Sequence, residues 1–382
     1  MRVLHIGKYY PPYAGGIENF MGDLLPELKK KGITPLAIVH NHGKQDGNHP
    51  DCIDGVDIVR VRTHGSVVYA PVSPAFGPHL KRVIRRFRPD VIHAHMPNTS
   101  VFWLFMISEA SGIPLVVHWH SDVVTSHIDQ RLKAAYHAYK PFEKAILKKA
   151  AAVIATSEPY LDSSVPLRDF RKKTHVIPLG LDKARFRITD ESAVAKAEMF
   201  WPGDGFRVLC IGRLTYYKGQ DVLIKAASGL SDIYVNIVGE GELKHKLKRL
   251  IVKYGAESTV TLTGFQDEET LKGLIKTCDC LVLPSLERTE AFGLVLLEAM
   301  RFSRPVIASN VSGSGMGFVV KHGQTGLLTT PNDAASLKNA LTTLLEDPAY
   351  AERMGKNGYD RFNRLFGINR IADEIIALYN RL

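Results

Sequence analysis

The chain has 382 residues and a hydrophobic fraction of 45%, which is enough for two domains with apolar cores. No run of about 18 apolar residues is present and the four cysteines are scattered, so we expect neither a membrane-spanning helix nor a disulfide framework. The formal net charge of +10 lies in residues 1–187, which hold 26 Lys and Arg against 16 Asp and Glu, and this surplus predicts an anionic partner such as a membrane surface, a nucleic acid or a phosphorylated acceptor.

The chain begins with a predicted strand, a turn and a helix. Residues 3–6 predict a short buried strand, and residues 16–30 predict the helix. This order is typical of the first unit of a nucleotide-binding α/β domain, but the G-x-G-x-x-G fingerprint is missing, so NAD is not expected. Gly15 and Gly16 allow a phosphate or a sugar to approach the helix start closely, with a plain tight turn as the alternative.

Two predicted helices carry many cations. Residues 81–88 hold five Lys and Arg, and residues 130–150 interleave lysines with Tyr136, Tyr139 and Phe142. Long basic side chains beside aromatic rings suit a membrane interface. The alternatives are a solvated helix face for the cations and core packing for the aromatic rings.

Two predicted strands lie between these helices, at residues 90–95 and 114–119, and both end in histidine-rich segments. Ligands of doubly wound sheets bind at the carboxyl ends of the strands. A buried structural histidine is the alternative at each position. The polar residues at these two ends are His95, His120, Ser121 and Asp122.

The second half of the chain restarts the α/β pattern. A strand is predicted over residues 207–211, and Arg213 and Lys218 follow it before a helix that opens near residue 220. Two cations at the end of a strand form a clamp for a diphosphate, because Arg offers a planar fork and Lys a point charge. The alternative is a pair of exposed surface charges.

The segment from residue 281 to residue 300 predicts a buried strand, a polar loop and a helix. Glu290 lies before the helix start and Glu298 about two turns beyond it. The backbone N–H groups near Gly293 have no intrahelical acceptor, so the helix start attracts anions. Two carboxylates flanking an anion site suit a ligand with phosphates and hydroxyls; solvated or capping acids are the alternative.

These motifs together resemble one enzyme family. The run from Glu290 to Glu298 resembles the E-x7-E element of retaining nucleotide-sugar glycosyltransferases of family 4. Residues 212–219 resemble the Gly-Arg and Lys-Gly element of that family, and residues 15–18 its Gly-Gly-x-Glu loop. The likeness covers most of the chain, from residue 10 to residue 331.

The resemblance implies an α/β protein of the GT-B fold, in which two doubly wound parallel, Rossmann-like domains face a central cleft. The implied organisation is an acceptor-binding domain over residues 1–187, a linker over 188–205, a donor-binding domain over 206–360, and a C-terminal helix over 361–382 that crosses back to the first domain.

The resemblance also implies roles for single residues. Glu298 would bind the ribose hydroxyls and Glu290 the donor sugar, and the cations would neutralise the diphosphate leaving group. The catalytic residues implied are His120, Glu290, Arg213 and Lys218. The donor-binding residues implied are Gly15, Gly16, Arg213, Lys218, Gly239, Gly264, Phe265, Glu290, Ala291, Phe292, Gly293, Leu294 and Glu298. The acceptor-side residues are His95, Ser121 and Asp122.

The implied reaction moves a hexose from a nucleoside diphosphate sugar to a glycan or polyprenyl-linked acceptor. The His-Ser-Asp form of residues 120–122 resembles a subgroup that often uses GDP-mannose or a related GDP-sugar to build bacterial surface polysaccharide. We expect no cofactor, and no metal since an Asp-x-Asp motif is missing. We also expect a cytoplasmic protein held peripherally at the anionic inner face of the membrane; the oligomeric state is not predicted.

Several other functions stay open at this point. The donor could be a UDP-sugar, or the chain could be a GT-B nucleotide-sugar epimerase or disaccharide synthase with the same pocket. A basic protein that binds nucleic acid is less compatible with the sequence, because no binding fold with aromatic and basic repeats is recognisable. An inactive scaffold conflicts with the presence of Arg213, Lys218, Glu290 and Glu298.

Overall fold

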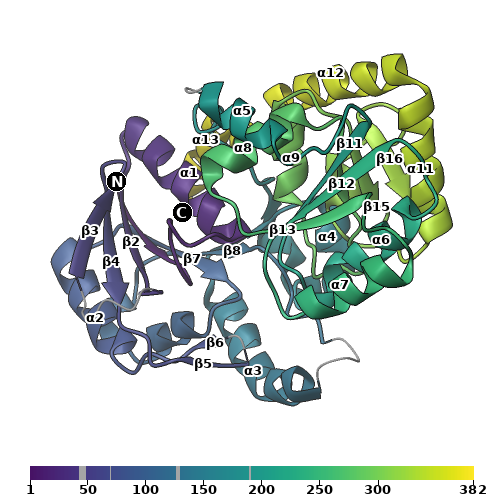
Figure 1. Ribbon diagram of the computed structural model, residues 1–382. Helices are drawn as coiled ribbons and strands as arrows, with labels where there is room; N and C mark the ends of the chain where they lie inside the picture. Colours follow the sequence, from purple (N-terminus) through teal and green to yellow (C-terminus); the bar gives the residue numbers. More distant parts are fainter. Residues whose placement is uncertain (43–48, 69, 126–129, 189–190) are drawn as a thin grey trace. The chain divides into compact units, whose positions relative to one another are not determined.

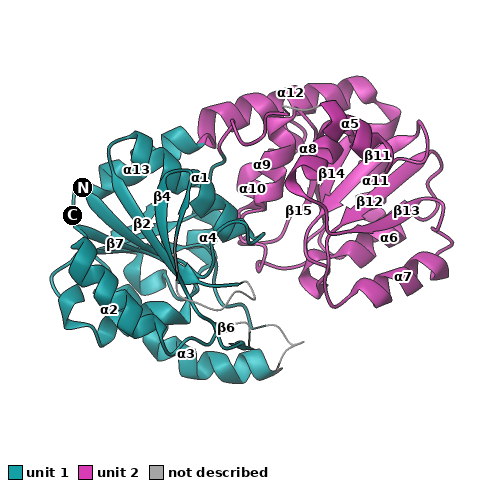
Figure 2. Ribbon diagram, turned by 60° about the vertical axis from the view of Figure 1, so that its left-hand side comes forward, with its two compact units in different colours: residues 1–181, 368–382 teal, residues 182–367 magenta. Residues whose placement is uncertain are grey.

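The computed structural model describes residues 1–382 except 43–48, 69, 126–129 and 189–190. The chain forms two compact units, one of residues 1–181 and 368–382 and the other of residues 182–367 (Figure 2). Among the described residues, no helix combines the length and the apolar character that crossing a membrane requires.

Unit 1 is built on an eight-stranded sheet with the order β10-β9-β8-β7-β1-β2-β4-β3, in which only β3 runs antiparallel to its neighbour (Figure 1). Its strands are β1 (Arg2–Ile6), β2 (Thr34–His40), β3 (His49–Ile53), β4 (Val56–Val61), β7 (Val91–Met96), β8 (Leu115–Trp119), β9 (Ala152–Ala155) and β10 (Thr174–Val176), and β5 (Ser66–Val67) pairs separately with β6 (Ala70–Pro71). The central strands β7 and β8 are buried along their whole length, as parallel strands covered on both faces should be.

The helices of unit 1 complete its layers. They are α1 (Gly16–Lys30), α2 (Phe76–Phe87), α3 (Gln130–Lys149), α4 (Glu158–Ser163) and α13 (Ile368–Tyr379), with 3₁₀ helices η1 (Thr99–Phe105), η2 (Ser108–Ala110) and η3 (Arg168–Lys173). The C-terminal α13 packs against α1. The order of the sheet reverses between β7 and β1, so loops that follow these two strands border the switch point where doubly wound sheets bind ligands.

Unit 2 holds a six-stranded parallel sheet with the order β13-β12-β11-β14-β15-β16. The strands are β11 (Phe206–Ile211), β12 (Ile233–Val238), β13 (Val260–Gly264), β14 (Cys280–Leu283), β15 (Val306–Ser309) and β16 (Gly326–Thr329). The helices are α5 (Glu191–Glu198), η4 (Tyr216–Lys218), α6 (Gln220–Ala227), α7 (Lys244–Lys253), α8 (Glu268–Thr277), α9 (Leu294–Arg301), α10 (Met316–Val319), α11 (Ala334–Glu346) and α12 (Pro348–Leu365). The switch point of this sheet lies between β11 and β14.

Two segments have more structure than the sequence pattern indicates. Within residues 188–205, of which 189–190 lie outside the described part, α5 forms and packs on α8 of unit 2. Residues 361–382 comprise the end of α12 and all of α13. Helix α12 ends at Leu365, with Phe366 as its C-cap residue. The Phe366 ring packs edge-on against Phe292, and the next residue, Gly367, is a weak helix former.

Candidate active site

The switch point of unit 2 brings together the loops that follow β11 and β14. Lys218 comes from η4 after β11, and Glu290 comes from the loop between β14 and α9. Their side chains form an ion pair, with 2.5 Å between Lys218 Nζ and Glu290 Oε2 and with exposed fractions of 16% and 13%. The sequence motifs lie 72 residues apart, so the sheet order is what joins them.

The ion pair has a defined electrostatic setting. Burial is the largest single effect on the pKa of Lys218 and lowers it, but the charge and hydrogen bond of Glu290, together with Tyr217 and Cys210, raise the pKa above its ordinary value. The loop that carries Glu290 is held in place because the Ser314 hydroxyl donates to the Glu290 carbonyl over 2.5 Å. A charged ammonium is therefore fixed at the end of β11.

Tyr217 is a neighbour of this pair that the sequence motifs do not single out. Burial raises the pKa of its phenol, and the nearby cations Lys218 and Arg213 lower it in part. Arg213 itself is exposed, with its backbone carbonyl accepting a hydrogen bond from Gln220. The ammonium of Lys218 also lies over the Tyr217 ring, 5.7 Å from its centroid.

The start of α9 lies beside the ion pair along the chain. Gly293 is the N-cap residue with φ +82°, and among the described residues no side chain caps the helix. The Leu296 N–H donates to the Gly293 carbonyl over 2.9 Å, whereas the N–H groups of the first two helical residues have no intrahelical acceptor. Ala291 and Phe292 are buried just before it, whereas Leu294 is half-buried. This geometry offers backbone donors and a positive dipole end to an anion.

Glu298 is half-buried and lies about one turn into α9, not two turns as the sequence pattern suggests, because the helix begins only at Leu294. Burial raises the pKa of its carboxyl, while the guanidinium of Arg185 pulls that pKa down. Arg185, which also lies over the Phe186 ring at 4.5 Å, was not identified from the sequence because no motif marks it. The carboxylate therefore has a cationic neighbour within unit 2.

The loops after β12 and β13 carry the remaining predicted donor residues. Gly239 has φ +142°, and a Cβ there would lie 2.1 Å from the Gly212 carbonyl, so the chain needs glycine where the loop after β12 passes the end of β11. Its N–H donates to the Gly264 carbonyl over 2.9 Å. Phe265 follows at the end of β13 with 67% of its surface exposed, which leaves the ring free to stack on a planar group.

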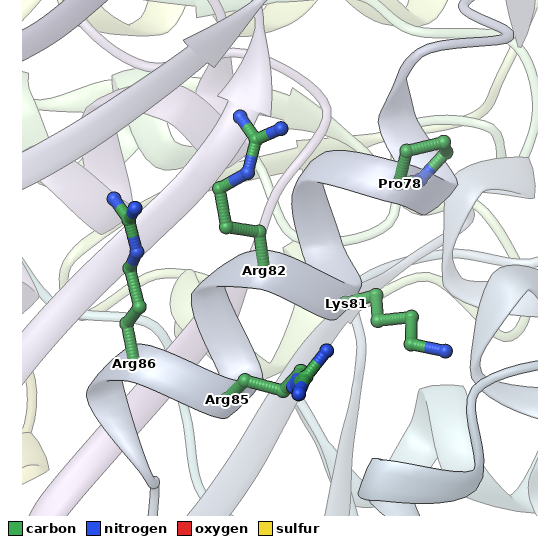
Figure 3. Close-up of a pocket in the computed structure, with 5 residues that line it drawn as sticks. All are labelled: Pro78, Lys81, Arg82, Arg85 and Arg86. Atoms are coloured by element: carbon green, nitrogen blue, oxygen red, sulfur yellow. The ribbon is translucent and has the colours of Figure 1, made fainter.

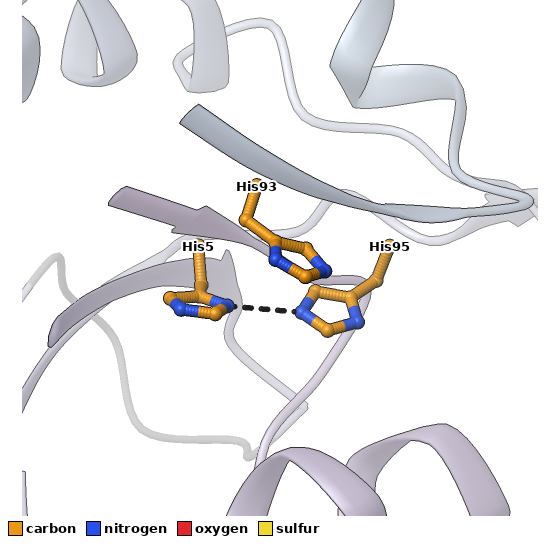
Figure 4. Close-up of side chains that lie close together, drawn as sticks. All are labelled: His5, His93 and His95. Carbon is orange, nitrogen blue, oxygen red and sulfur yellow. Dashed lines mark hydrogen bonds between the residues drawn. The ribbon is translucent and has the colours of Figure 1, made fainter. Parts of the chain in front are cut away.

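Unit 1 places five histidines on one face of its sheet. His5 of β1 pairs in register with His93 of β7, and His95 pairs with His118 of β8. His120 follows β8 on the same face, and all five are at most 4% exposed. Figure 4 shows His5, His93 and His95 side by side.

Hydrogen bonds link these rings in two chains. His5 Nδ1 lies 3.1 Å from His95 Nε2, and His95 Nδ1 lies 2.9 Å from His120 Nε2. The second chain runs from the Tyr379 hydroxyl of α13 through His93 to His118. The Nδ1 atom of His120 is buried without a hydrogen-bond partner among the described residues, as are the Nε2 atoms of His5 and His118.

The histidines are neutral at neutral pH. Burial, followed by repulsion from neighbouring imidazoles, holds the pKa of His120 well below its usual range, and burial lowers the pKa of His95 to about 3. Nitrogens of His5, His93 and His95 lie within 4.8 Å of one another. These rings stack with interplanar angles of 20° to 26°, so their in-plane lone pairs do not converge on one point as metal ligation requires.

The other predicted site residues of unit 1 lie at the start of α1 and in the turn after β8. Gly15 caps α1, and a Cβ there would lie 2.2 Å from Glu18 Oε2, whereas Gly16 opens the helix. Asp122 is buried and accepts hydrogen bonds from Trp119 Nε1 and the Ser164 hydroxyl, both at 2.7 Å. That carboxylate therefore fixes the turn after β8, while Ser121 beside it is half-buried.

The two sheets of the chain match solved structures of the GT-B fold, and with the family matches given below this shows a glycosyltransferase of that fold, as the sequence predicts. The sucrose-phosphate synthase from Thermosynechococcus elongatus has the same fold, with a TM-score of 0.84, 27% sequence identity, and coverage of 100% of this chain and 98% of that chain. A structure of Anabaena Alr3699/HepE in complex with UDP and glucose matches over 100% of both chains with a TM-score of 0.80 and 22% identity.

Sequence comparison gives the family. Residues 14–185 match the family described as Glycosyltransferase Family 4, and residues 193–361 match Glycosyl transferases group 1. The O-antigen chain mannosyltransferase C of Escherichia coli is 30% identical over 100% of this chain and 99% of its own length. The D-rhamnosyltransferase WbpZ of Pseudomonas aeruginosa is 31% identical over 96% of this chain and 92% of its own. The chain belongs to glycosyltransferase family 4.

Proposed function

We propose that the protein transfers a hexose, mannose from GDP-mannose, to a hydroxyl of a glycan or polyprenyl-linked acceptor. The observation that carries the proposal is the Lys218–Glu290 ion pair at the switch point of unit 2, next to the uncapped start of α9. A cation, a carboxylate and a helix start in one place suit a donor with both phosphates and hydroxyls. Similarity to an O-antigen chain mannosyltransferase supports mannose and a role in bacterial polysaccharide synthesis.

In this proposal the donor is held by unit 2. Lys218, Arg213 and the first N–H groups of α9 bind the diphosphate, and their charge stabilises the leaving group as negative charge develops on it. Glu298 accepts hydrogen bonds from the ribose hydroxyls, and Glu290 from the sugar hydroxyls. Fixed cations supply the stabilisation that a metal ion would otherwise give, so activity should persist in EDTA.

The transfer proceeds with retention at the anomeric carbon. The bond between C1 and the β-phosphate oxygen breaks, the acceptor oxygen bonds to C1 on the same face, and the leaving phosphate takes the acceptor proton. An α-linked donor should therefore give an α-linked product by NMR, and a β-linked product would overturn retention.

The acceptor is presented at the inner face of the cytoplasmic membrane in this proposal. The excess of cations in residues 1–187 supports an anionic environment for unit 1. A polyprenyl diphosphate carrier would supply both the anchor and the negative charge.

The test is calorimetric binding of GDP, UDP and ADP to the full chain, followed by hydrolysis of the matching sugar donors. We expect GDP to bind best, with at least about tenfold loss in Glu298→Ala because a charged hydrogen-bond partner of ribose is removed. Glu257→Ala, an exposed carboxylate of unit 2, is the matched control. Preference for UDP would overturn the GDP-mannose assignment, and binding of no nucleotide would overturn the donor site itself.

A further inference from the structure

Three side chains of unit 1 meet in a buried polar cluster near the carboxyl ends of β7 and β8. Asn98 lies two residues beyond β7 and is 3% exposed, and Glu143 of α3 is 2% exposed. Tyr139 lies one turn before Glu143, and its ring centroid is 5.2 Å from that of Phe102 in η1, the helix that Asn98 caps. Burial raises the pKa of the Tyr139 phenol, the Glu143 charge raises it further and the Asn98 backbone lowers it, so the three residues are neighbours.

One polar atom of each side chain in this cluster has no hydrogen-bond partner among the described residues. These atoms are Asn98 Nδ2, the Tyr139 hydroxyl and Glu143 Oε2. Asn98 Oδ1 accepts from the Ser100 N–H over 3.0 Å, and Glu143 Oε1 accepts from the Tyr136 hydroxyl over 3.0 Å, so in each case the second polar atom is the one left over. Folded proteins seldom bury such atoms unpaired, and three together indicate a place for a bound polar group.

The three unpaired atoms are complementary to a hydroxyl group. An amide N–H donates, a carboxylate oxygen accepts and a phenol can do both. One sugar hydroxyl can therefore accept a hydrogen bond from Asn98 and donate one to Glu143. A phosphate brings only acceptor oxygens and a negative charge, which the Glu143 carboxylate repels.

The charges around Glu143 also disfavour an anion. Burial is the main cause that raises the Glu143 pKa to about 7; the Tyr136 hydrogen bond lowers it, the Asp122 carboxylate raises it, and the exposed Lys140 has the smallest effect and lowers it. The carboxyl group is therefore ionised above pH 7 and has a second carboxylate nearby. Four exposed cations of unit 1 belong instead to helix α2, where they surround a shallow hollow: Lys81, Arg82, Arg85 and Arg86 (Figure 3).

We propose that Asn98, Tyr139 and Glu143, called here the hydroxyl subsite, bind a neutral sugar of the acceptor through one of its hydroxyls. The loop that carries Asn98 borders the switch point of unit 1, where ligands of such sheets bind. The subsite selects against a sugar that is itself phosphorylated, whereas a diphosphate further along the acceptor is compatible with it. This inference rests on the proposed function, because it names the chemical class of the acceptor.

The test is saturation-transfer NMR titration of the full chain at pH 8 with methyl glycosides of mannose, N-acetylglucosamine and galactose, each beside its 6-phosphate. At least one neutral glycoside should bind, and at least about tenfold more tightly than its phosphate. Glu143→Gln keeps the size of the side chain and removes its charge, so it should weaken binding of the neutral glycoside about tenfold without weakening the phosphate. Tyr139→Phe should weaken the neutral glycoside about threefold at an unchanged Tm, because the deleted hydroxyl has no partner within the described chain.

Glu158→Gln is the matched control, since it makes the same change at a carboxylate of unit 1 whose side chain is 62% exposed, and sugar binding should stay the same. Equal loss in this control, equal affinity for neutral and phosphorylated sugars, or binding of neither would each overturn the proposal. Neutral-sugar affinity unchanged in both Glu143→Gln and Tyr139→Phe would also overturn it and would show that the three atoms hold only a buried water. GDP binding, measured by calorimetry on the same samples, should be unaffected by every variant, so failure of the donor site and failure of the hydroxyl subsite are distinguishable.

Discussion

Lys218 and Glu290 each stabilise the charged form of the other, because they form an ion pair. Both side chains have little exposure, and removing one partner of such a pair leaves the other charge poorly compensated. A substitution at either position therefore changes the electrostatics of the whole switch point as well as one contact to the substrate.

We expect Glu290→Gln to lower kcat about 100-fold with a smaller change in KM. The amide keeps the size of the side chain but loses the charge that raises the Lys218 pKa and binds the donor sugar. Steady-state transfer kinetics measure this effect, with Glu257→Gln as the surface control. Unchanged turnover in Glu290→Gln would contradict the assignment of this carboxylate to the site.

The buried histidines make unit 1 sensitive to acid. The folded pKa of His95 is about 3 and the ordinary value is 6.5, so the unfolded chain binds more protons between these values. Above pH 6.5 the His95 ring is neutral in both the folded and the unfolded chain, so the full free energy of unfolding is present. As the pH falls from 6.5 toward 3, the unfolded chain binds the proton and the free energy of unfolding decreases. The same direction holds for His5, His93, His118 and His120, whose pKa values are lowered by burial and by neighbouring rings.

We therefore expect His95 to cost unit 1 about 2 kcal/mol of stability between pH 6.5 and pH 5, with the other four histidines acting in the same direction. Hydrogen exchange of β7 and β8 over this range measures the change. His95→Gln should flatten the pH dependence while lowering stability at pH 7. If hydrogen-exchange protection of β7 and β8 in the unmodified chain did not change with pH, the buried histidines would not destabilise unit 1 in acid.

At the scale of elements, the start of α9 depends on one backbone conformation. Gly293 has φ +82°, and an added Cβ would lie 2.8 Å from Leu296 Cδ1 and 3.0 Å from Leu283 Cδ2. A side chain there strains the backbone and displaces the N–H groups that face the proposed diphosphate.

Gly293→Ala should destabilise unit 2 by about 1 to 3 kcal/mol and weaken GDP binding at least about tenfold. The matched control is Gly255→Ala, because Gly255 has φ +61° but open space where the methyl group would go. Thermal unfolding and calorimetry of both variants separate backbone strain from the site effect. Equal losses of GDP binding in the two variants would show that α9 has no special part in it.

The sequence predicts some of these elements well and others poorly, for physical reasons. The sequence alone singles out Lys218 and the run from Glu290 to Glu298 as candidates, because each follows a predicted strand within a short motif. The spacing of apolar residues marks the start of the helix. The histidine cluster is not found as a unit, because strand register and a helix from the far end of the chain assemble it. His5 and Tyr379 carry no local pattern that would pair them with His93 or His95.

At the scale of the whole molecule, each unit has its own sheet and its own switch point, and the donor residues of the proposal lie almost wholly in unit 2. We expect GDP at about 100 times its Kd to stabilise unit 2 by about 2.7 kcal/mol. Hydrogen exchange should then slow in β11, β14 and α9. Protection confined to β1, β7 and β8 would instead place the nucleotide on unit 1.

The path of the chain also has a consequence for synthesis. Unit 1 is made from residues 1–181 and 368–382, and α13 in the second stretch supplies Tyr379 to the buried His93. On the ribosome, every residue of unit 2 emerges before the segment that completes unit 1. The amino-terminal unit, although begun first, is therefore the last to be finished, and a message that stops short of α13 would leave the buried His93 without its Tyr379 partner.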